Sequence, residues 1–341
     1  MTDDEVLTWL LDSDPALRWQ VERDLAGEPA EVWEATRART ATEGFGARLL
    51  ALQDDDGQWA GGAYFPREVR EGTFPDEPGQ PYTATTWSLN QLREWGVPAA
   101  ALRRRTGELL AEVRWEYEDL PYWGGEVDVC INAFTLANGA WLGADASQIE
   151  AWFPAHQLED GGWNCEWVEG STRSSFHSTL NAVVGLLDHE QRAGGSDVLR
   201  AARHRGEEHL LQRHLLLRLS TGEPHGPWAM HFAYPFRWTY SALRAADHVR
   251  AASLHDGRAP DPRLAEAVAL VRDAREEDGT WHQQLRHEGR VWFDVDGGVG
   301  EPSRWLTFHA LRLLRWWDGS SGVRSGGAAA TSIRLGDDAQ G

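Results

Sequence analysis

The sequence predicts an all-α protein built from repeated helical hairpins, and three observations support this. First, three segments end in the same pattern of Gln or Arg, three residues, Gly, one residue and Trp. They are 49–59 (LLALQDDDGQW), 153–163 (FPAHQLEDGGW) and 271–281 (VRDAREEDGTW). Second, apolar residues recur at helical spacing before these turns. Third, a second, more uniformly apolar segment follows the turns, as expected for a helix that is buried on several sides.

Each repeated turn fits the end of an outer helix. The glycine is free to take positive φ at the helix end, and the tryptophan then packs back on the neighbouring unit. The three sets are Gln53/Gly57/Trp59, Gln157/Gly161/Trp163 and Arg275/Gly279/Trp281. Before the third turn, Leu264, Val268 and Val271 fall at i, i+4 and i+7, and Asp261-Pro262 supplies an N-cap followed by Pro.

The apolar segments predict the inner helices of five hairpins, two of which have degenerate turns. These segments are 83–96, 130–143, 177–189, 236–249 and 303–317. Thr83, Cys130 and His177 begin three of them and are spaced by 47 residues. A further helix starts at Asp14-Pro15 and ends near Gly27, while the Gly-, Ser- and Ala-rich residues 319–341 are expected to be disordered.

Composition excludes several classes of function. The net charge of -20 opposes binding to phosphate backbones, so we expect no nucleic-acid partner. All 33 basic residues are arginine, which excludes Schiff-base and P-loop lysines. The acidic N-terminus lacks the basic region of a secretory signal, and no apolar run is long enough to span a membrane. We therefore expect a soluble, cytoplasmic protein whose two cysteines are reduced.

The Q-x-x-x-G-x-W turns resemble the repeats of squalene and terpene cyclases. That superfamily is shared with the β subunits of protein prenyltransferases. The resemblance covers about residues 40–318 and implies an α/α toroid, a closed ring of about five to six helical hairpins around an apolar cavity. It divides the chain into an N-terminal helical segment (1–40), the toroid (41–318) and a tail (319–341).

A candidate metal site follows from the 47-residue spacing. In a closed ring, the starts of successive inner helices lie at the same rim, which places Asp128 and Cys130 next to His177. A carboxylate, a thiolate and an imidazole are all zinc ligands, and three protein ligands leave one position open. The ordinary alternative is a buried cysteine, an N-capping aspartate and a hydrogen-bonded histidine.

Two stretches around these residues resemble the prenyltransferase β subunits more closely. VDVCINAFTLA is similar to their D-x-C element, and GGWNCEWVEGSTRSSFH is similar to the turn that leads to their zinc histidine. The resemblance implies that Asp128, Cys130 and His177 hold Zn²⁺ and are catalytic, and that a partner protein is needed. Cys165 is a further candidate ligand, which would close the site and make it structural.

The preferred hypothesis is a zinc-assisted transfer or cyclisation on a hydrophobic, isoprenoid-like small molecule. Two alternatives stay open: a class II-like terpene cyclase with Asp128 as the acid, and a non-catalytic lipid-binding protein with structural zinc. The candidate substrate-binding residues are aromatic side chains at or near inner-helix starts, with arginines for an anionic group. They are Tyr82, Trp87, Phe134, Trp238, Tyr240, Trp305, Phe308, Arg173 and Arg237.

Overall fold

The structure, a computed structural model, describes residues 1–326 of the chain and the side chains of residues 1–319. The described residues are mostly helical. Their one sheet is a two-stranded antiparallel pair in which Trp281 lies opposite Ser303. The prediction of a mostly helical protein is therefore confirmed. No helix in this part of the chain combines the length and apolar character that crossing a membrane requires.

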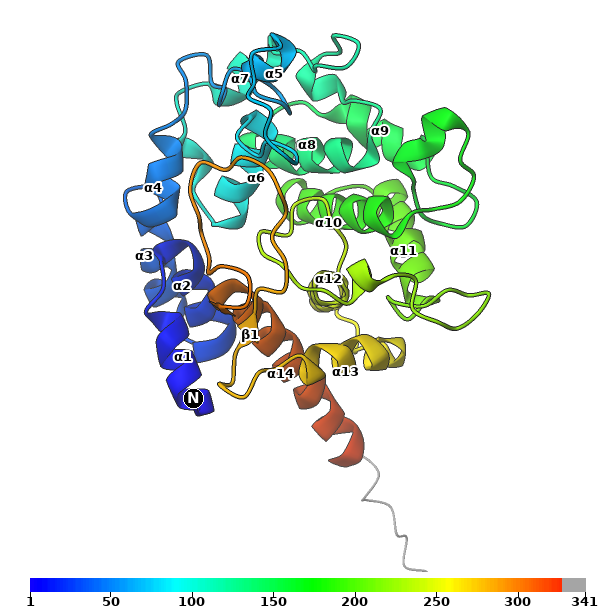
Figure 1. The fold of residues 1–341 in the computed structure, drawn as a ribbon. Coiled ribbons are helices and arrows are strands. Elements are labelled where there is room, and N and C mark those ends of the chain that lie inside the picture. The colour runs from blue at the N-terminus through cyan, green and yellow to red at the C-terminus, as the bar shows by residue number, and fades with distance from the viewer. Residues whose placement is uncertain (327–341) are drawn as a thin grey trace, which may run out of the picture.

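The helices and strands follow the chain in the order drawn in Figure 1. The α-helices are α1 (Asp3–Leu11), α2 (Pro15–Val21), α3 (Ala30–Arg39), α4 (Gly44–Leu50), α5 (Arg67–Arg70), α6 (Thr85–Glu94), α7 (Thr106–Ala111), α8 (Val129–Leu142), α9 (Ser147–Ala155), α10 (Phe176–Ala193), α11 (Asp197–Leu211), α12 (Ala242–His255), α13 (Ala265–Asp273) and α14 (Arg304–Gly326). The shorter elements are η1 (Glu22–Ala26), η2 (Ala99–Ala101), η3 (Tyr122–Gly124), η4 (Cys165–Glu169), η5 (Pro227–Ala229), η6 (Pro262–Leu264), β1 (Trp281–His282) and β2 (Pro302–Ser303).

The predicted inner helices pack against one another in chain order. Helix α6 contacts α8, α8 contacts α10, α10 contacts α12, and α12 contacts α14. Helix α14 also touches η1, which continues from α2, and α2 is joined to α6 through α4. Figure 1 accordingly shows the N-terminal helices beside the start of α14. Their apolar faces form one continuous buried cluster.

The repeated turns all close in the same way. The side chain of Gln53, Gln157 or Arg275 donates a hydrogen bond to the carbonyl of the turn glycine, at 3.0, 2.6 and 2.9 Å respectively. The three glycines have φ of 85°, 93° and 87°, as predicted. This conformation favours glycine because it lacks a Cβ, so the turn reverses the chain without strain.

The tryptophan of each turn is fully buried and uses both of its N–H groups. Its indole donates to a carbonyl ten residues earlier, at 2.7–2.9 Å, which ties the turn to its own outer helix. Its backbone N–H donates to a threonine hydroxyl at 3.0–3.1 Å in the following inner helix. The pairs are Trp59 with Leu49 and Thr85, Trp163 with Phe153 and Thr179, and Trp281 with Val271 and Thr307.

The same turns also join each hairpin to a neighbour. Gln53 accepts from the backbone N–H of Arg103, and Gln157 donates to the carbonyl of Ala202. The third turn instead contacts the N-terminus, because Arg275 forms an ion pair of 2.6 Å with Asp3. The N-terminal ammonium adds a 2.8 Å bond to the carbonyl of Asp278.

Most predicted helix ends are confirmed, and two are wrong. Asp14 and Asp261 cap their helices through side-chain oxygens, as the sequence predicts. The helix expected from residue 236 begins only at Ala242, because the Ser241 hydroxyl caps it and Arg237 has a φ of 52°. The helix expected to end at residue 317 continues to Gly326, so residues 319–326 of the tail predicted to be disordered are helical. The rest of that tail, 327–341, lies outside the described residues.

The tryptophan–threonine bond gives a stability prediction. Replacing Thr179 or Thr307 by the isosteric Val leaves a buried N–H without an acceptor, so each change should lower the free energy of unfolding by about 1–3 kcal/mol. Thr135 is the matched control, because it is equally buried but only donates back to the carbonyl of Ile131 within its own helix. Urea unfolding measures the difference, and equal effects at all three positions would contradict the argument.

Candidate functional site

The two cysteines lie together at the start of α8. The Sγ atoms of Cys130 and Cys165 are 3.7 Å apart. Cys130 also accepts a 3.3 Å hydrogen bond from the amide of Asn181 on α10, and Cys165 accepts one of 3.4 Å from Ser178. Helices α8 and α10 pack closely, so residues 130 and 181 meet although they are far apart in sequence.

The two thiols differ in acidity. The hydrogen bond to Cys165, burial and the nearby Asp128 raise the pKa of Cys130 well above its ordinary value. The same bond lowers the pKa of Cys165. Cys165 is also the more accessible of the two, being half-buried where Cys130 is buried. Cys165 is therefore the more acidic and the more reactive of the two thiols.

Asp128 occupies the N-cap position of α8 without capping it. Its side chain makes no bond to the first-turn N–H groups. Burial raises the pKa of Asp128, and a hydrogen bond with the Cys165 thiol opposes that shift. The carboxyl group of Asp128 is thus directed to the thiol pair, which places three of the four predicted metal-site residues in contact.

His177 begins α10 but is held by a different set of contacts. Its Nδ1 accepts a 3.0 Å hydrogen bond from the backbone N–H of Tyr240, which leaves the ring proton on Nε2. Its ring lies 4.7 Å from that of Trp228 and 5.5 Å from that of Trp238. Burial and the nearby Arg244 lower the pKa of His177 to about 4, so the ring is neutral at pH 7.

These positions fit a zinc site only in part. Zinc in tetrahedral geometry, with Zn–S bonds of about 2.3 Å, separates two sulfurs by about 3.8 Å, which matches the thiol pair. However, no three of Asp128, Cys130, Cys165 and His177 bring their ligand atoms within 4.8 Å of one another. The residues as placed therefore do not form the three-ligand site that the resemblance implies, and no step proposed below depends on zinc.

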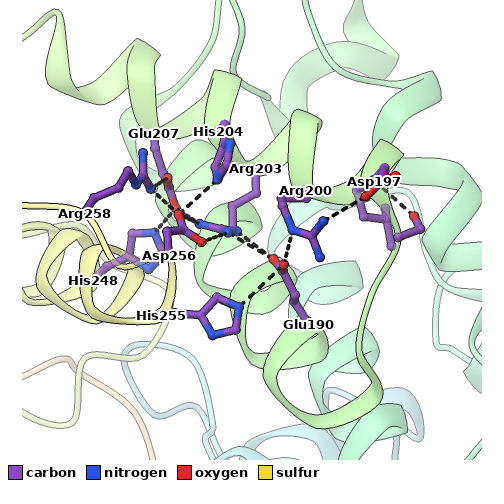
Figure 2. A network of polar contacts seen from close by, with 12 residues as sticks. Glu190, Asp197, Arg200, Arg203, His204, Glu207, His248, His255, Asp256 and Arg258 are labelled. Carbon is purple, nitrogen blue, oxygen red and sulfur yellow. Dashed lines mark hydrogen bonds and ion pairs between the residues drawn. The ribbon is translucent and has the colours of Figure 1, made fainter.

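Among the described residues, a different set does bring three possible ligand atoms within 4.8 Å of one another: His204, Glu207 and Asp256. Figure 2 shows that arginines already occupy this cluster. Arg203 binds Glu207 and Asp256, each at 2.8 Å, and Arg258 contacts the same two carboxylates. The cluster is an ion-pair network that joins α11 to the end of α12, with its charge already balanced.

A cavity of about 570 Å³ lies between α6, α8, α10, α12 and α14, and we call it the interhelical cavity. Its apolar wall includes five aromatic side chains, Trp19, Trp87, Phe134, Trp141 and Phe236. Asp128, Cys130, Cys165 and His177 are not part of its lining. The thiol pair is nevertheless connected to it, because Asn181 donates to Cys130 and accepts a 2.8 Å bond from Arg244 in the cavity wall.

The predicted wall residues divide into three groups. Trp87, Phe134 and Arg237 line the interhelical cavity. Tyr82 packs edge-on against Trp87, with ring centres 5.0 Å apart, and lies under Arg237. The others lie in the core or on the surface. Tyr240, Trp305 and Phe308 are buried in the core, whereas Trp238 and Arg173 are exposed.

The sequence analysis missed most of the polar lining of this cavity. Arg93, Arg244 and Arg312 point to it, together with Asn90 and Glu94. A single arginine within an apolar helix is the only signal for each of these residues. Such a residue is as often an ion-pair partner, and Arg312 indeed binds Asp247.

Comparison with known proteins gives no assignment. A scan against protein-family models and a search of curated proteins both find no match.

The thiol pair gives a reactivity prediction. With limiting iodoacetamide at pH 7.5, Cys165 should be alkylated about tenfold faster than Cys130, because it is more exposed and has the lower pKa. Peptide mapping by mass spectrometry measures both rates in the same sample. The Cys165→Ser variant shows whether Cys130 stays slow without its neighbour, and equal rates in the native protein would contradict the assignment.

Proposed function

We propose that this protein is an enzyme similar to prenyltransferases and terpene cyclases, which binds and transforms a hydrophobic small molecule in the interhelical cavity. The observation that carries the proposal is the cavity itself. Its volume of about 570 Å³ is in the range of small-molecule sites, and aromatic side chains from four segments of the chain form part of its wall. The faces of Trp87 and Phe134 suit an alkene or a positive charge that develops on one.

The proposal includes a closed α/α toroid around this cavity. Two observations support closure. The helix contacts form a continuous circuit from α6 through α14 and η1 back to α4. The third repeated turn binds Asp3, whereas the first two turns bind the next hairpin. The N-terminal segment thereby takes the place of a following repeat.

The two alternatives are a terpene cyclase with Asp128 as the acid and a lipid-binding protein without catalysis. Burial raises the pKa of Asp128, as an acid catalyst requires, but its carboxyl group contacts Cys165 and lies outside the cavity lining. The lipid-binding protein would use the same cavity but would leave the bound molecule chemically unchanged. A bound molecule recovered unchanged after long incubation would favour the binding protein over the enzyme.

Filling the cavity should abolish ligand retention. Ala251 lines it from α12, and Ala251→Trp should reduce the lipid-extract component retained in native mass spectrometry by about tenfold, a loss of about 1.4 kcal/mol. The matched control is Ala265→Trp on the exposed face of α13. Equal retention by the two variants would place the ligand elsewhere.

Ligand retention should not depend on zinc. Because no three of the predicted ligands converge, dialysis against a chelator should leave the retained ligand unchanged. Elemental analysis before and after dialysis confirms removal of any metal. Loss of the ligand in chelator, with recovery on adding zinc, would instead support the zinc-dependent enzyme that the resemblance implies.

A further inference from the structure

The interhelical cavity carries the opposite charge to the protein as a whole. The chain has a net charge of -20, yet the cavity lining contains seven arginines and three carboxylates. Four of these arginines bind carboxylates: Arg23, Arg93, Arg192 and Arg312. The remaining three form no ion pair with any described residue. Arg37 lies over Trp19, whereas Arg237 and Arg244 lie over Tyr82 and Phe236.

Arg237 makes no hydrogen bond through its guanidinium to the described part of the chain. The group lies 4.2 Å from the ring centre of Tyr82, which leaves its N–H groups free to face the cavity. Burial lowers the pKa of Arg237 to about 10, so the side chain is charged at neutral pH. Its backbone φ of 52° is uncommon for a residue with a Cβ, which indicates that the position is specifically held.

Arg244 is held more firmly but is equally without a counter-charge. Its side chain donates to the carbonyl of Thr239 at 2.9 Å and to the amide oxygen of Asn181 at 2.8 Å. A guanidinium has five N–H donors, so these two bonds leave donors available to a ligand. Burial lowers the pKa of Arg244, also to about 10.

The carboxylate of Glu94 attracts both arginines, but only at a distance. Glu94 also lines the cavity, but it forms an ion pair with neither Arg237 nor Arg244. Its carboxyl group bonds to the Tyr234 hydroxyl, and burial raises its pKa. His177 and His287, whose pKa values respond to these arginines, are both neutral at pH 7 because burial lowers their pKa to about 4.

We propose that Arg237 and Arg244 form a binding site for the carboxylate or phosphate group of an amphiphilic ligand, whose apolar body lies against Trp87 and Phe134. A buried charge without a partner is costly, and an oxyanion supplies both the missing charge and the missing acceptors. Arginine matches this role because its planar fork can hold two oxygens at once. The inference rests on the proposed function, since it names the ligand of the same cavity.

The test compares ligands that differ only in the head group. Dodecanoate, dodecyl phosphate and dodecanol share an apolar chain, and free phosphate and acetate lack one. Calorimetric titration should show that at least one amphiphilic anion binds about tenfold or more tightly than dodecanol, a difference of about 1.4 kcal/mol. The first two ligands distinguish a carboxylate site from a phosphate site, and the free anions show how much the chain contributes.

Variants then locate the effect. Arg237→Gln and Arg244→Gln should each remove most of the preference for the anion while leaving dodecanol binding unchanged. Arg173→Gln is the control, because Arg173 is exposed and outside the cavity lining. Far-UV circular dichroism checks that the variants fold, and the comparison of ligands on the native protein stands even if they do not.

The possible results separate the two proposals. Equal affinity of the anions and the alcohol would overturn the anion site while leaving the hydrophobic cavity in place. A preference that survives both arginine variants would place the anion elsewhere and overturn the assignment to these residues. If none of the amphiphiles binds, the cavity proposal and the anion site fail together.

Discussion

The hydrogen bond from the backbone N–H of a buried tryptophan to a threonine hydroxyl is the interaction on which the arrangement of helices depends. It occurs at Trp59, Trp163 and Trp281, each time with a threonine in the next inner helix. The indole of the same residue binds the preceding outer helix. One residue, through its backbone and its side chain, thus fixes both helices of a hairpin, and both of its N–H groups are satisfied where water cannot reach them.

This bond also explains how a cavity can exist among tightly packed helices. Because each turn fixes the start of its inner helix, the inner helices do not have to fill the space between them to be held in place. Other side chains of these helices, such as Trp87 on α6 and Val184 on α10, are then free to line a cavity. The helices that the tryptophan turns hold therefore also supply part of the cavity wall.

The sequence predicts the turns well because their chemistry is local. Gly161 and its equivalents need positive φ, and the glutamine that reaches the glycine carbonyl is only four residues away. Contacts between distant segments cannot be predicted from such a local sequence pattern. The role of Arg275 depends on Asp3 at the other end of the chain, and the late start of α12 depends on the conformation of Arg237.

In the candidate site, too, the sequence does not predict which distant side chains meet. A spacing of 47 residues correctly suggests that α8 and α10 are neighbours, but it does not determine which faces meet. The side chain that reaches Cys130 is Asn181, one helical turn beyond His177, and the second sulfur comes from Cys165 in the preceding turn. Asn181 also holds Arg244, so the thiol pair and the cavity arginine share one positioning residue.

The contrast between an acidic protein and a basic cavity constrains the ligand further. A net charge of -20 repels small anions as they approach, although salt screens this repulsion beyond about 8 Å at physiological ionic strength. Arg237 and Arg244 act only at short range, within the wall of the cavity. Free phosphate would therefore meet the repulsion without an apolar body to offset it. Burial of a chain against Trp87 and Phe134 contributes about 25 cal/mol per Å² of apolar surface, which favours amphiphiles over inorganic anions.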